Sequence, residues 1–302
     1  MILFSQRYRK KHKAMAAKRL KPNNPFCSPC PDAIVADAQE FYNILWKINP
    51  YAKHNPVPKP ITVRKANLPS LTSDYVVSEK NDGVRFCLMV AQTEDEETYS
   101  VSIDGKRHIA TCPMLIENPV LTVKDRRMNL YNGTLLDGEW ISNDGDEGEF
   151  VVFDCVVAGG FNARKRPFHD RLELAKLIVA AIQPVGWSIR VKTFYPSSYI
   201  MDLWGRIQKG EMGRCDGLIF VSKILEITTG TTEGTKKWKP NSHQTVDLRY
   251  QGGVFCCVGE YGRYIASPIT VKQEGPFHPF IEDRMYEVRP EGNEWVVLKE
   301  RP

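Results

Sequence analysis

The segment from Tyr75 to Val90 constrains the fold more than any other stretch of the sequence. Two apolar, β-branched runs, Tyr75–Val77 and Val84–Val90, flank Lys80 and the turn-forming residues Asn81-Asp82-Gly83. Such runs favour β-strands, and Asn-Asp-Gly favours a tight turn between them. The pattern therefore predicts strand, turn and strand, with the Lys80 amine held at the mouth of a sheet.

The composition of the 302 residues is that of a globular protein, with 42% hydrophobic and 25% charged residues. This length has room for one large domain and one small domain, each with its own core. No apolar run approaches the roughly 18 residues that a membrane span needs, so we expect no membrane partner.

The basic charge is concentrated at the N-terminus. Residues 1–22 contain eight Lys or Arg residues and no acidic residue, so 33 of the 41 basic residues remain for the rest of the chain against 36 acidic ones. The interpretations left open for this segment are a disordered leader, a nuclear-import signal and a non-specific RNA contact.

The eight cysteines do not follow a disulfide framework. Cys27 and Cys30 form a single Cys-x-x-Cys pair without a second pair at zinc spacing, and Cys256 and Cys257 are adjacent. We therefore expect unpaired thiols in a reducing compartment, and a zinc site at Cys27 and Cys30 has no further support.

Hydrophobic periodicity predicts the elements of a mixed α+β domain. Helices are expected at Asp32–Ile48 and His169–Ile182, and a third is expected to run to about Ile207 with Ser197 or Ser198 as its cap. The predicted strands and hairpins are Tyr99–Ile109, Thr134–Trp140 paired with Glu149–Val157, Ser188–Tyr195, Asp216–Val221 and Thr235–Lys239.

The sequence pattern changes beyond Asn241, where short predicted strands alternate with Gly or Pro turns. This spacing favours a small β-barrel, with the oligonucleotide-binding (OB) barrel as the leading candidate. The expected organisation is a basic leader and linker at 1–31, a large domain at 32–240 and the barrel at 241–302. The five expected strands are Thr245–Tyr250, Gly253–Val258, Arg263–Ile265, Met285–Val288 and Trp295–Leu298.

Three cations accompany the Lys80 amine in this interpretation. A lysine becomes nucleophilic when neighbouring cations or a dry site lower its pKa, and Arg85, Lys237 and Lys239 are candidate neighbours. On a strand, Lys237 and Lys239 face the same side, which suits an anion such as phosphate. The alternative for this segment alone is a solvent-exposed basic edge strand.

Two carboxylates complete a possible site. Glu139 projects from an otherwise apolar strand, and Asp216 opens the apolar run Asp216–Phe220. Carboxylates at strand ends are suited to a magnesium ion that neutralises a triphosphate. Each carboxylate taken singly is explained as well by a turn, because Asp-Gly is a common turn former.

The ordered set of motifs resembles a known superfamily, the covalent nucleotidyltransferases, which comprise DNA ligases, RNA ligases and mRNA capping guanylyltransferases. The match covers roughly residues 60–302, and the form of motif V is closest to the capping guanylyltransferases. Motifs I, III, IIIa, IV and V are matched by Lys80–Arg85, Asp137–Glu139, Phe150–Val156, Asp216–Phe220 and Lys237–Pro240.

The resemblance implies that Lys80 attacks the α-phosphate of GTP, forms a lysyl-GMP adduct, and passes GMP to the 5′-diphosphate end of RNA. It implies Mg²⁺ or Mn²⁺ as the cofactor, with Asp216 and Glu139 near the metal. It further implies a nucleotidyltransferase domain of antiparallel sheets with flanking helices, followed by the OB barrel. The nucleotide-binding residues that it implies are Glu79, Arg85, Glu139, Phe153, Lys192, Lys237, Lys239 and Arg107.

Two positions depart from the family pattern. Gly105 follows Asp104 where the family usually has arginine, and Lys106 or Arg107 is the candidate replacement. Residues 295–302 resemble the start of motif VI, without its usual Asp-Lys. The interpretations left open for this are a domain cut from a longer protein and a degenerate enzyme.

The alternatives to a guanylyltransferase are an ATP-dependent polynucleotide ligase and a non-catalytic RNA-binding module that retains the fold. The expected partners are an RNA triphosphatase, a cap methyltransferase and the transcription machinery. The expected location is the nucleus, or the cytoplasm for a viral protein.

Overall fold

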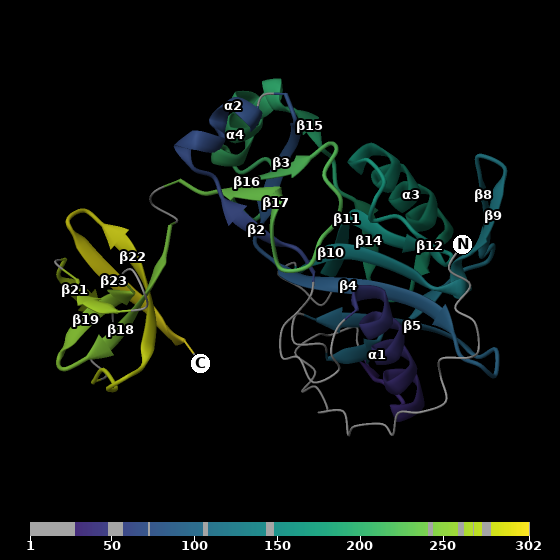
Figure 1. Ribbon diagram of the computed structural model, residues 1–302, viewed down its shortest axis with the longest axis horizontal. Helices are drawn as coiled ribbons and strands as arrows, with labels where there is room; N and C mark the ends of the chain where they lie inside the picture. The colour runs from purple at the N-terminus through teal and green to yellow at the C-terminus, as the bar shows by residue number, and fades with distance from the viewer. Residues whose placement is uncertain are drawn as a thin grey trace. The chain divides into compact units, whose positions relative to one another are not determined.

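The computed structural model describes residues 28–47, 57–71, 73–104, 108–142, 148–240, 244–258, 263–267, 269–273 and 279–301. The chain divides into two compact units, Met1–Lys237 and Trp238–Pro302, and each is described by itself (Figure 1). The basic stretch 1–22 and the candidate nucleotide contact Arg107 lie outside the described residues.

An eight-stranded sheet forms the larger part of the first unit, in the order β1-β6-β5-β4-β10-β11-β12, with β14 paired to β11. Pairing is antiparallel except between β14 and β11. The predicted pairing of the strands around Trp140 and Phe150 is confirmed, because these two residues lie opposite each other. The strands are β1 (Ser28–Pro29), β4 (Val84–Gln92), β5 (Thr98–Asp104), β6 (Ile109–Thr111), β10 (Thr134–Ser142), β11 (Gly148–Ala158), β12 (Phe161–Asn162) and β14 (Ser188–Val191).

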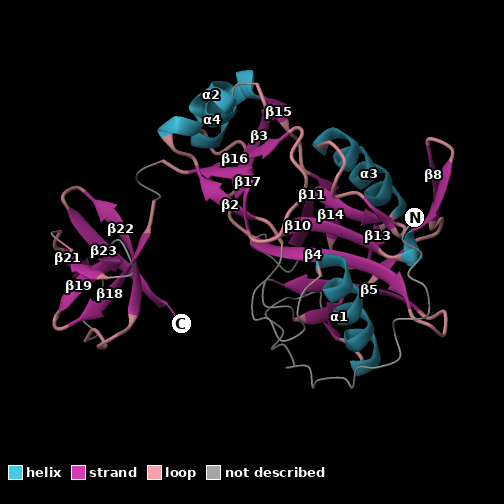
Figure 2. Cartoon of the chain, in the orientation of Figure 1, coloured by secondary structure: helices cyan, strands magenta, loops and turns pink. Residues whose placement is uncertain are grey.

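Two helices, α1 (Asp32–Trp46) and α3 (Phe168–Ala181), flank this sheet (Figure 2). Leu135 belongs to the core cluster of α1, whereas its neighbour Leu136 belongs to the core cluster of α3. Successive side chains of a strand point to opposite faces, so one strand, β10, supplies both cores. Both helices were predicted from their apolar periodicity and are confirmed.

The second large sheet of the first unit has five strands, in the order β15-β3-β16-β17-β2. It contains β3, whose last residues are Lys80 and Asn81, whereas β4 belongs to the eight-stranded sheet. The predicted turn at 81–83 therefore connects two sheets instead of two neighbouring strands. The strands are β2 (Lys59–Thr62), β3 (Tyr75–Asn81), β15 (Tyr195–Pro196), β16 (Cys215–Ser222) and β17 (Thr231–Trp238).

The prediction of one strand over Ser188–Tyr195 is wrong, because β14 ends at Val191 and β15 belongs to the other sheet. The predicted serine cap is also wrong: a 3₁₀ turn precedes α4, whose N-cap is Tyr199, without a side-chain hydrogen bond. The remaining elements are η1 (Lys65–Asn67), α2 (Leu68–Leu71), β7 (Met114–Leu115), β8 (Val120–Val123), β9 (Arg126–Asn129), η2 (Leu130–Asn132), β13 (Gln183–Pro184), η3 (Ser197–Tyr199) and α4 (Ile200–Gln208).

The second unit is a six-stranded sheet in the order β20-β19-β18-β22-β23-β21. Its core holds an aromatic cluster of Phe255, Phe280 and Tyr286, whose ring centroids lie 4.8 to 5.7 Å apart. All five predicted strands are present, and β21 is an addition. The strands are β18 (Val246–Gln251), β19 (Val254–Val258), β20 (Tyr264–Ala266), β21 (Val271–Gln273), β22 (Met285–Glu291) and β23 (Glu294–Arg301).

The fold class is thus mixed α+β and dominated by sheets, as expected. The strand pairings of the second unit do not close into a barrel within the described residues, so the expected OB barrel is not confirmed. None of the described helices has the length and apolar character needed to cross a membrane.

Candidate functional site

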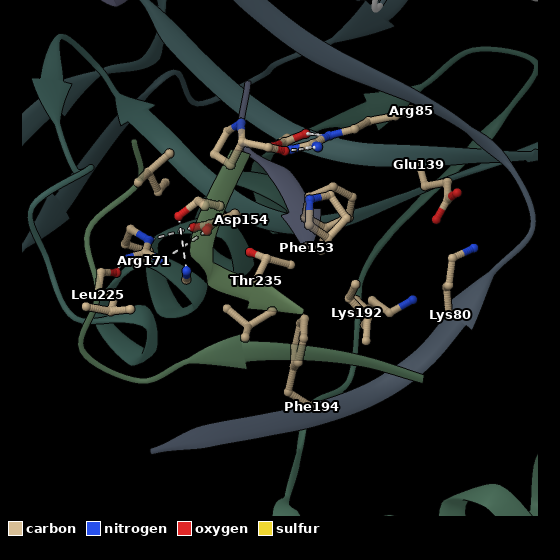
Figure 3. Close-up of a pocket in the computed structure, with 18 of the residues that line it drawn as sticks. Lys80, Arg85, Glu139, Phe153, Asp154, Arg171, Lys192, Phe194, Leu225 and Thr235 are labelled. Carbon is tan, nitrogen blue, oxygen red and sulfur yellow. Dashed lines mark hydrogen bonds and ion pairs between the residues drawn. The ribbon is translucent and has the colours of Figure 1, made fainter. Parts of the chain in front are cut away.

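A cavity of about 190 Å³ lies in the first unit and is lined by residues of both sheets (Figure 3). The loop between β3 and β4 crosses from one sheet to the other, so Lys80 and Arg85 line the same cavity from different sheets. The charged and aromatic residues of the lining include Glu79, Lys80, Arg85, Asp137, Glu139, Phe153, Asp154, Arg171 and Lys192.

Lys80 lies near the end of β3 and is held by a carboxylate of the neighbouring strand. Its Nζ donates to Asp216 Oδ1 at 2.7 Å, and the two side chains are 22% and 19% exposed. The register of β16 against β3 shifts between Cys215 and Gly217, and this bulge contains Asp216. Bulges redirect side chains beside functional sites. The contact described for the Lys80 amine is therefore with Asp216, one of the two carboxylates expected at the site.

Glu139 lies on β10 of the eight-stranded sheet and holds the loop that follows Lys80. Its Oε1 accepts a hydrogen bond from the backbone N of Gly83 at 3.2 Å. A Cβ atom at Gly83 would lie 2.3 Å from the carbonyl oxygen of Trp140, so only glycine fits this approach. Burial raises the pKa of Glu139, while the charges of Lys192 and Lys80 act in the opposite direction. In Figure 3 the Glu139 carboxylate faces the Lys80 amine.

Arg85 is fixed by a residue that we did not single out from the sequence. Arg85 lies opposite Glu139 in the strand register, but its guanidinium binds both carboxylate oxygens of Asp137, with Nε to Oδ1 at 2.9 Å. Burial acts to lower the pKa of Arg85, but the neighbouring groups, Asp137 first among them, together hold that pKa above its ordinary value. The guanidinium also lies 5.3 Å from the ring centroid of Phe153, which orients that ring in the cavity.

Lys192 lies in a buried polar network beside Lys80. It is 4% exposed, its Nζ donates to Asn81 Oδ1, and it lies 3.4 Å from Glu79 Oε1. Burial lowers the pKa of Lys192, against the raising effect of Glu79 and Glu139. Ser78 Oγ lies 2.7 Å from Glu79 Oε2, so every member has a hydrogen-bond partner.

Asp154 and Arg171 form a second ion pair, which Figure 3 shows on the other side of Phe153 from Lys80 and Glu139. Arg171 Nε and Nη2 donate to the two oxygens of Asp154 at 2.8 and 3.0 Å. Burial raises the pKa of Asp154, while Arg171 opposes that shift. The sequence did hold a signal for this pair, because Arg171 stands at helical spacing with the buried Leu174 and Ile178.

The structure brings most of the expected site residues to one cavity: Glu79, Lys80, Arg85, Glu139, Phe153 and Lys192 line it, and Asp216 contacts Lys80. Lys237 lies on β17 and does not line the cavity, and Lys239 belongs to the second unit. Their expected phosphate contacts stay predictions. Lys236 precedes Lys237 on β17 and points to the other face of the strand. It is 1% exposed, and its Nζ lies 5.3 Å from the Tyr75 ring centroid.

Within the described ranges, no group of three or more His, Cys, Asp or Glu side chains is arranged to hold a metal ion. The seven cysteines in this part of the chain are free thiols.

The chain is similar to known capping enzymes. Residues 30–241 match the family described as mRNA capping enzyme, catalytic domain. The mRNA-capping enzyme of Caenorhabditis elegans is 25% identical over 76% of this chain and 39% of its own length. That of Danio rerio is 28% identical over 82% of this chain and 44% of its own length. The mRNA-capping enzyme subunit alpha of Schizosaccharomyces pombe is 27% identical over 64% of this chain and 52% of its own length.

Among solved structures, a mycobacterial DNA ligase D complexed with ATP and MES has a TM-score of 0.45 and 13% sequence identity. The structural match covers 82% of this chain and 95% of the ligase chain. The chain spans about half, or less, of the length of these curated relatives. Since the family match extends over well more than half of the 302 residues, the chain belongs to the mRNA capping enzyme family, through its catalytic domain.

Proposed function

We propose that this chain is a GTP:RNA guanylyltransferase. The observation that carries the proposal is the partly exposed Lys80 amine, 2.7 Å from the Asp216 carboxylate at a cavity lined by charged and aromatic groups. The family match supports the same reaction class. Lysine is an established type of nucleophile for covalent catalysis once its amine has lost a proton.

In the first step, Lys80 Nζ attacks the α-phosphorus of GTP. The N–P bond forms while the bond from the α-phosphorus to the bridging oxygen breaks, and pyrophosphate leaves. Asp216 Oδ1 is at hydrogen-bond distance to accept the proton that the amine must lose. In the second step, a terminal oxygen of the RNA 5′-diphosphate attacks the same phosphorus, the N–P bond breaks, and the amine regains a proton.

The nucleoside would lie across the Phe153 ring, which Arg85 and Asp137 hold in place. Aromatic rings stack on nucleobases with a favourable energy of about 1 to 3 kcal/mol per base. Glu79 and Lys192 supply a carboxylate and an ammonium group to the lining, as polar contacts for the nucleotide. Lys237 and Lys239 are proposed to bind phosphate oxygens, and Arg107 is a further candidate nucleotide contact.

A divalent cation, Mg²⁺ or Mn²⁺, fits the carboxylates near Lys80. Mg²⁺ is usually held by one or two carboxylates together with substrate phosphates, and Asp216 and Glu139 are the two candidates. Such an ion would neutralise the charge of the triphosphate. We expect a chelator to reduce adduct formation below detection and excess Mg²⁺ to restore it. Adduct formation at the full rate in chelator would contradict this assignment.

The proposal includes the wider setting of the reaction. The second unit is proposed to be an OB-type domain, and the acceptor to be a 5′-diphosphate RNA. An RNA triphosphatase, a cap methyltransferase and the transcription machinery are the proposed partners, in the nucleus. An RNA triphosphatase is the class of enzyme that would supply the diphosphate end.

The test is incubation of the full chain with labelled nucleotides and magnesium, followed by denaturing electrophoresis. We expect a covalent adduct with GTP in the wild type and none in Lys80→Ala. An adduct with ATP and none with GTP would instead identify a polynucleotide ligase. No adduct with any nucleotide, together with RNA binding that is indifferent to Lys80→Ala, would identify a non-catalytic RNA-binding module.

A further inference from the structure

Arg171 is an arginine on the buried face of α3. It is 2% exposed, and its Nε and Nη2 bind the two oxygens of Asp154 at 2.8 and 3.0 Å. Taking two charges out of water costs several kcal/mol per ion, and such a pair often adds nothing to stability over a well-packed apolar pair. The pair therefore calls for an explanation other than stability.

The remaining donor of Arg171 reaches two backbone segments. Nη1 donates to the carbonyl oxygen of Arg166 at 2.6 Å and lies 3.4 Å from that of Leu225. Two backbone bonds reinforce the connection: Phe168 N to Lys223 O at 3.0 Å, and Ile227 N to Arg164 O at 2.9 Å. Hydrogen bonds thus hold the segment 223–227 against the start of α3 and the residues before it. The Arg171 guanidinium contributes to this connection.

Both structures that Arg171 connects are walls of the cavity. Asp154 directly follows Phe153 on β11, and Leu225, Glu226 and Ile227 line the cavity. Figure 3 shows Arg171 between Asp154 and Leu225, with Phe153 further into the cavity. A shift of the guanidinium would therefore change the separation between the Phe153 strand and the 225–227 wall.

We propose that Arg171, through Asp154, is a positioning residue for the nucleoside part of the substrate. The inference rests on the proposed function and adds a residue to it. The described contacts of the Arg171 guanidinium are the Asp154 carboxylate and two backbone carbonyls. The described contact of the Lys80 amine is Asp216 on β16. The loss of Arg171 should weaken nucleotide binding and leave the chemical step at saturating GTP nearly unchanged.

The test compares the wild-type chain with Arg171→Lys, Arg171→Gln, Asp154→Asn and the double variant Asp154→Asn/Arg171→Gln. Lysine keeps the charge but cannot form the bidentate bond. Binding is measured with an α,β-methylene analogue of GTP, which cannot release pyrophosphate, so its Kd reports binding alone. We expect about tenfold weaker binding in each single variant, with adduct formation at saturating GTP within about twofold of the wild type.

The double variant tests whether the two residues act as a unit. Because residues in direct contact are not additive, its Kd should resemble that of the weaker-binding single variant instead of showing the product of both losses. A Kd raised by the product of the two single-variant factors would show that the two residues act independently and would overturn their assignment as a unit. The matched control is Ile178→Ala, which removes buried volume from the same helix without touching the cavity.

We expect Ile178→Ala to lower the melting temperature and leave the Kd unchanged. A lower melting temperature in Arg171→Lys with an unchanged Kd would show a purely structural role and overturn the proposal. A slower rate of adduct formation at saturating GTP, together with an unchanged Kd, would overturn the proposal as well. If the wild type binds the analogue but forms no adduct with GTP, the proposed function fails while the Kd series still decides the role of Arg171.

Discussion

Two ion pairs in the same cavity are built in opposite ways. Lys80 and Asp216 share one described hydrogen bond at 2.7 Å, and their side chains are 22% and 19% exposed. The side chains of Arg171 and Asp154 are 3% and 12% exposed, and the guanidinium reaches two carboxylate oxygens and two backbone carbonyls. The first pair leaves an amine accessible, whereas in the second every guanidinium nitrogen has an acceptor.

The difference in exposure separates a group that can react, the Lys80 amine, from a group that holds the structure in place, the Arg171 guanidinium. Water screens a pair that is partly exposed, so the amine can leave its partner at a lower cost than in a fully buried pair. A buried charged pair is costly to break, because removing one partner leaves an uncompensated charge. Variants of Lys80 should therefore change the chemistry and not the stability, and variants of Asp154 should lower the stability.

Lys80→Arg should show the largest effect. The guanidinium keeps a positive charge next to Asp216 but, being always protonated, cannot attack phosphorus. We expect adduct formation to fall by at least about 10⁴-fold, as for other covalent nucleophiles, with a change of less than about 1 kcal/mol in stability. Labelled-GTP incubation and thermal unfolding measure the two quantities. Residual adduct formation above this level would contradict the role of Lys80.

Asp216→Asn should have the next largest effect. The amide oxygen can still accept a hydrogen bond from Lys80, but the proton acceptor and its charge are lost. General-base catalysis typically contributes about 10²- to 10⁴-fold, so we expect the rate of adduct formation to fall by about 10²-fold or more. Stopped time courses at saturating GTP measure this rate. A rate equal to that of the wild type would remove Asp216 from the mechanism.

Asp154→Asn should act on stability. It leaves Arg171 buried with a neutral partner, for which we expect a loss of about 3 kcal/mol. For a unit of this size, that corresponds to a fall of about 6 to 12 °C in Tm. The control is Lys176→Ala on the same helix, which removes an ion pair whose side chains are 53% and 47% exposed. Equal changes in Tm for both variants would contradict the contrast between buried and exposed pairs.

Glu139→Gln should have the smallest effect on stability, and this effect should depend on pH. Burial raises the pKa of Glu139 above its ordinary value of 4.5, so the fold favours the protonated form. Its contribution to stability is fully present below about pH 4.5 and is lost as the pH rises through the raised pKa. Glutamine is neutral throughout, so the variant should have a higher Tm than the wild type at pH 7, on the order of 1 °C.

This gain should disappear at pH 4, where the wild-type carboxyl is itself largely protonated. Differential scanning calorimetry at both pH values measures it. A variant that is less stable than the wild type at pH 7 would show that the charges of Lys192 and Lys80 outweigh the burial of the carboxylate.

Local patterns explain why the elements were predictable. The alternation around Trp140 and Phe150 and the apolar stripes of α1 and α3 are periodicities that side-chain direction alone imposes. The same reasoning failed at Ser188–Tyr195, where the apolar pattern continues but the chain passes from one sheet to the other. Strand periodicity does not specify the partner strand, so it cannot detect such a change.

The partners of the site residues were harder to predict, because they come from distant parts of the sequence. Lys80 and Asp216 are 136 residues apart, and Arg85 and Asp137 are 52 apart. Asp137 was visible as one member of an acidic motif, yet only the packing of β10 against β4 shows that it holds Arg85. Arg171 interrupted an apolar helical stripe, which is a signal for a buried ion pair that sequence reasoning could have used.

The sequence by itself determined that Lys80 lies on a strand before a turn, that Asp216 and Glu139 lie on strands, and that a sheet-dominated α+β protein contains them. Only the tertiary structure decided that β3 and β4 separate into two sheets and enclose a cavity. It also decided which carboxylate each cation contacts. The physical reason is that periodicity is a local property of the chain, whereas strand pairing and charge pairing depend on how distant segments pack.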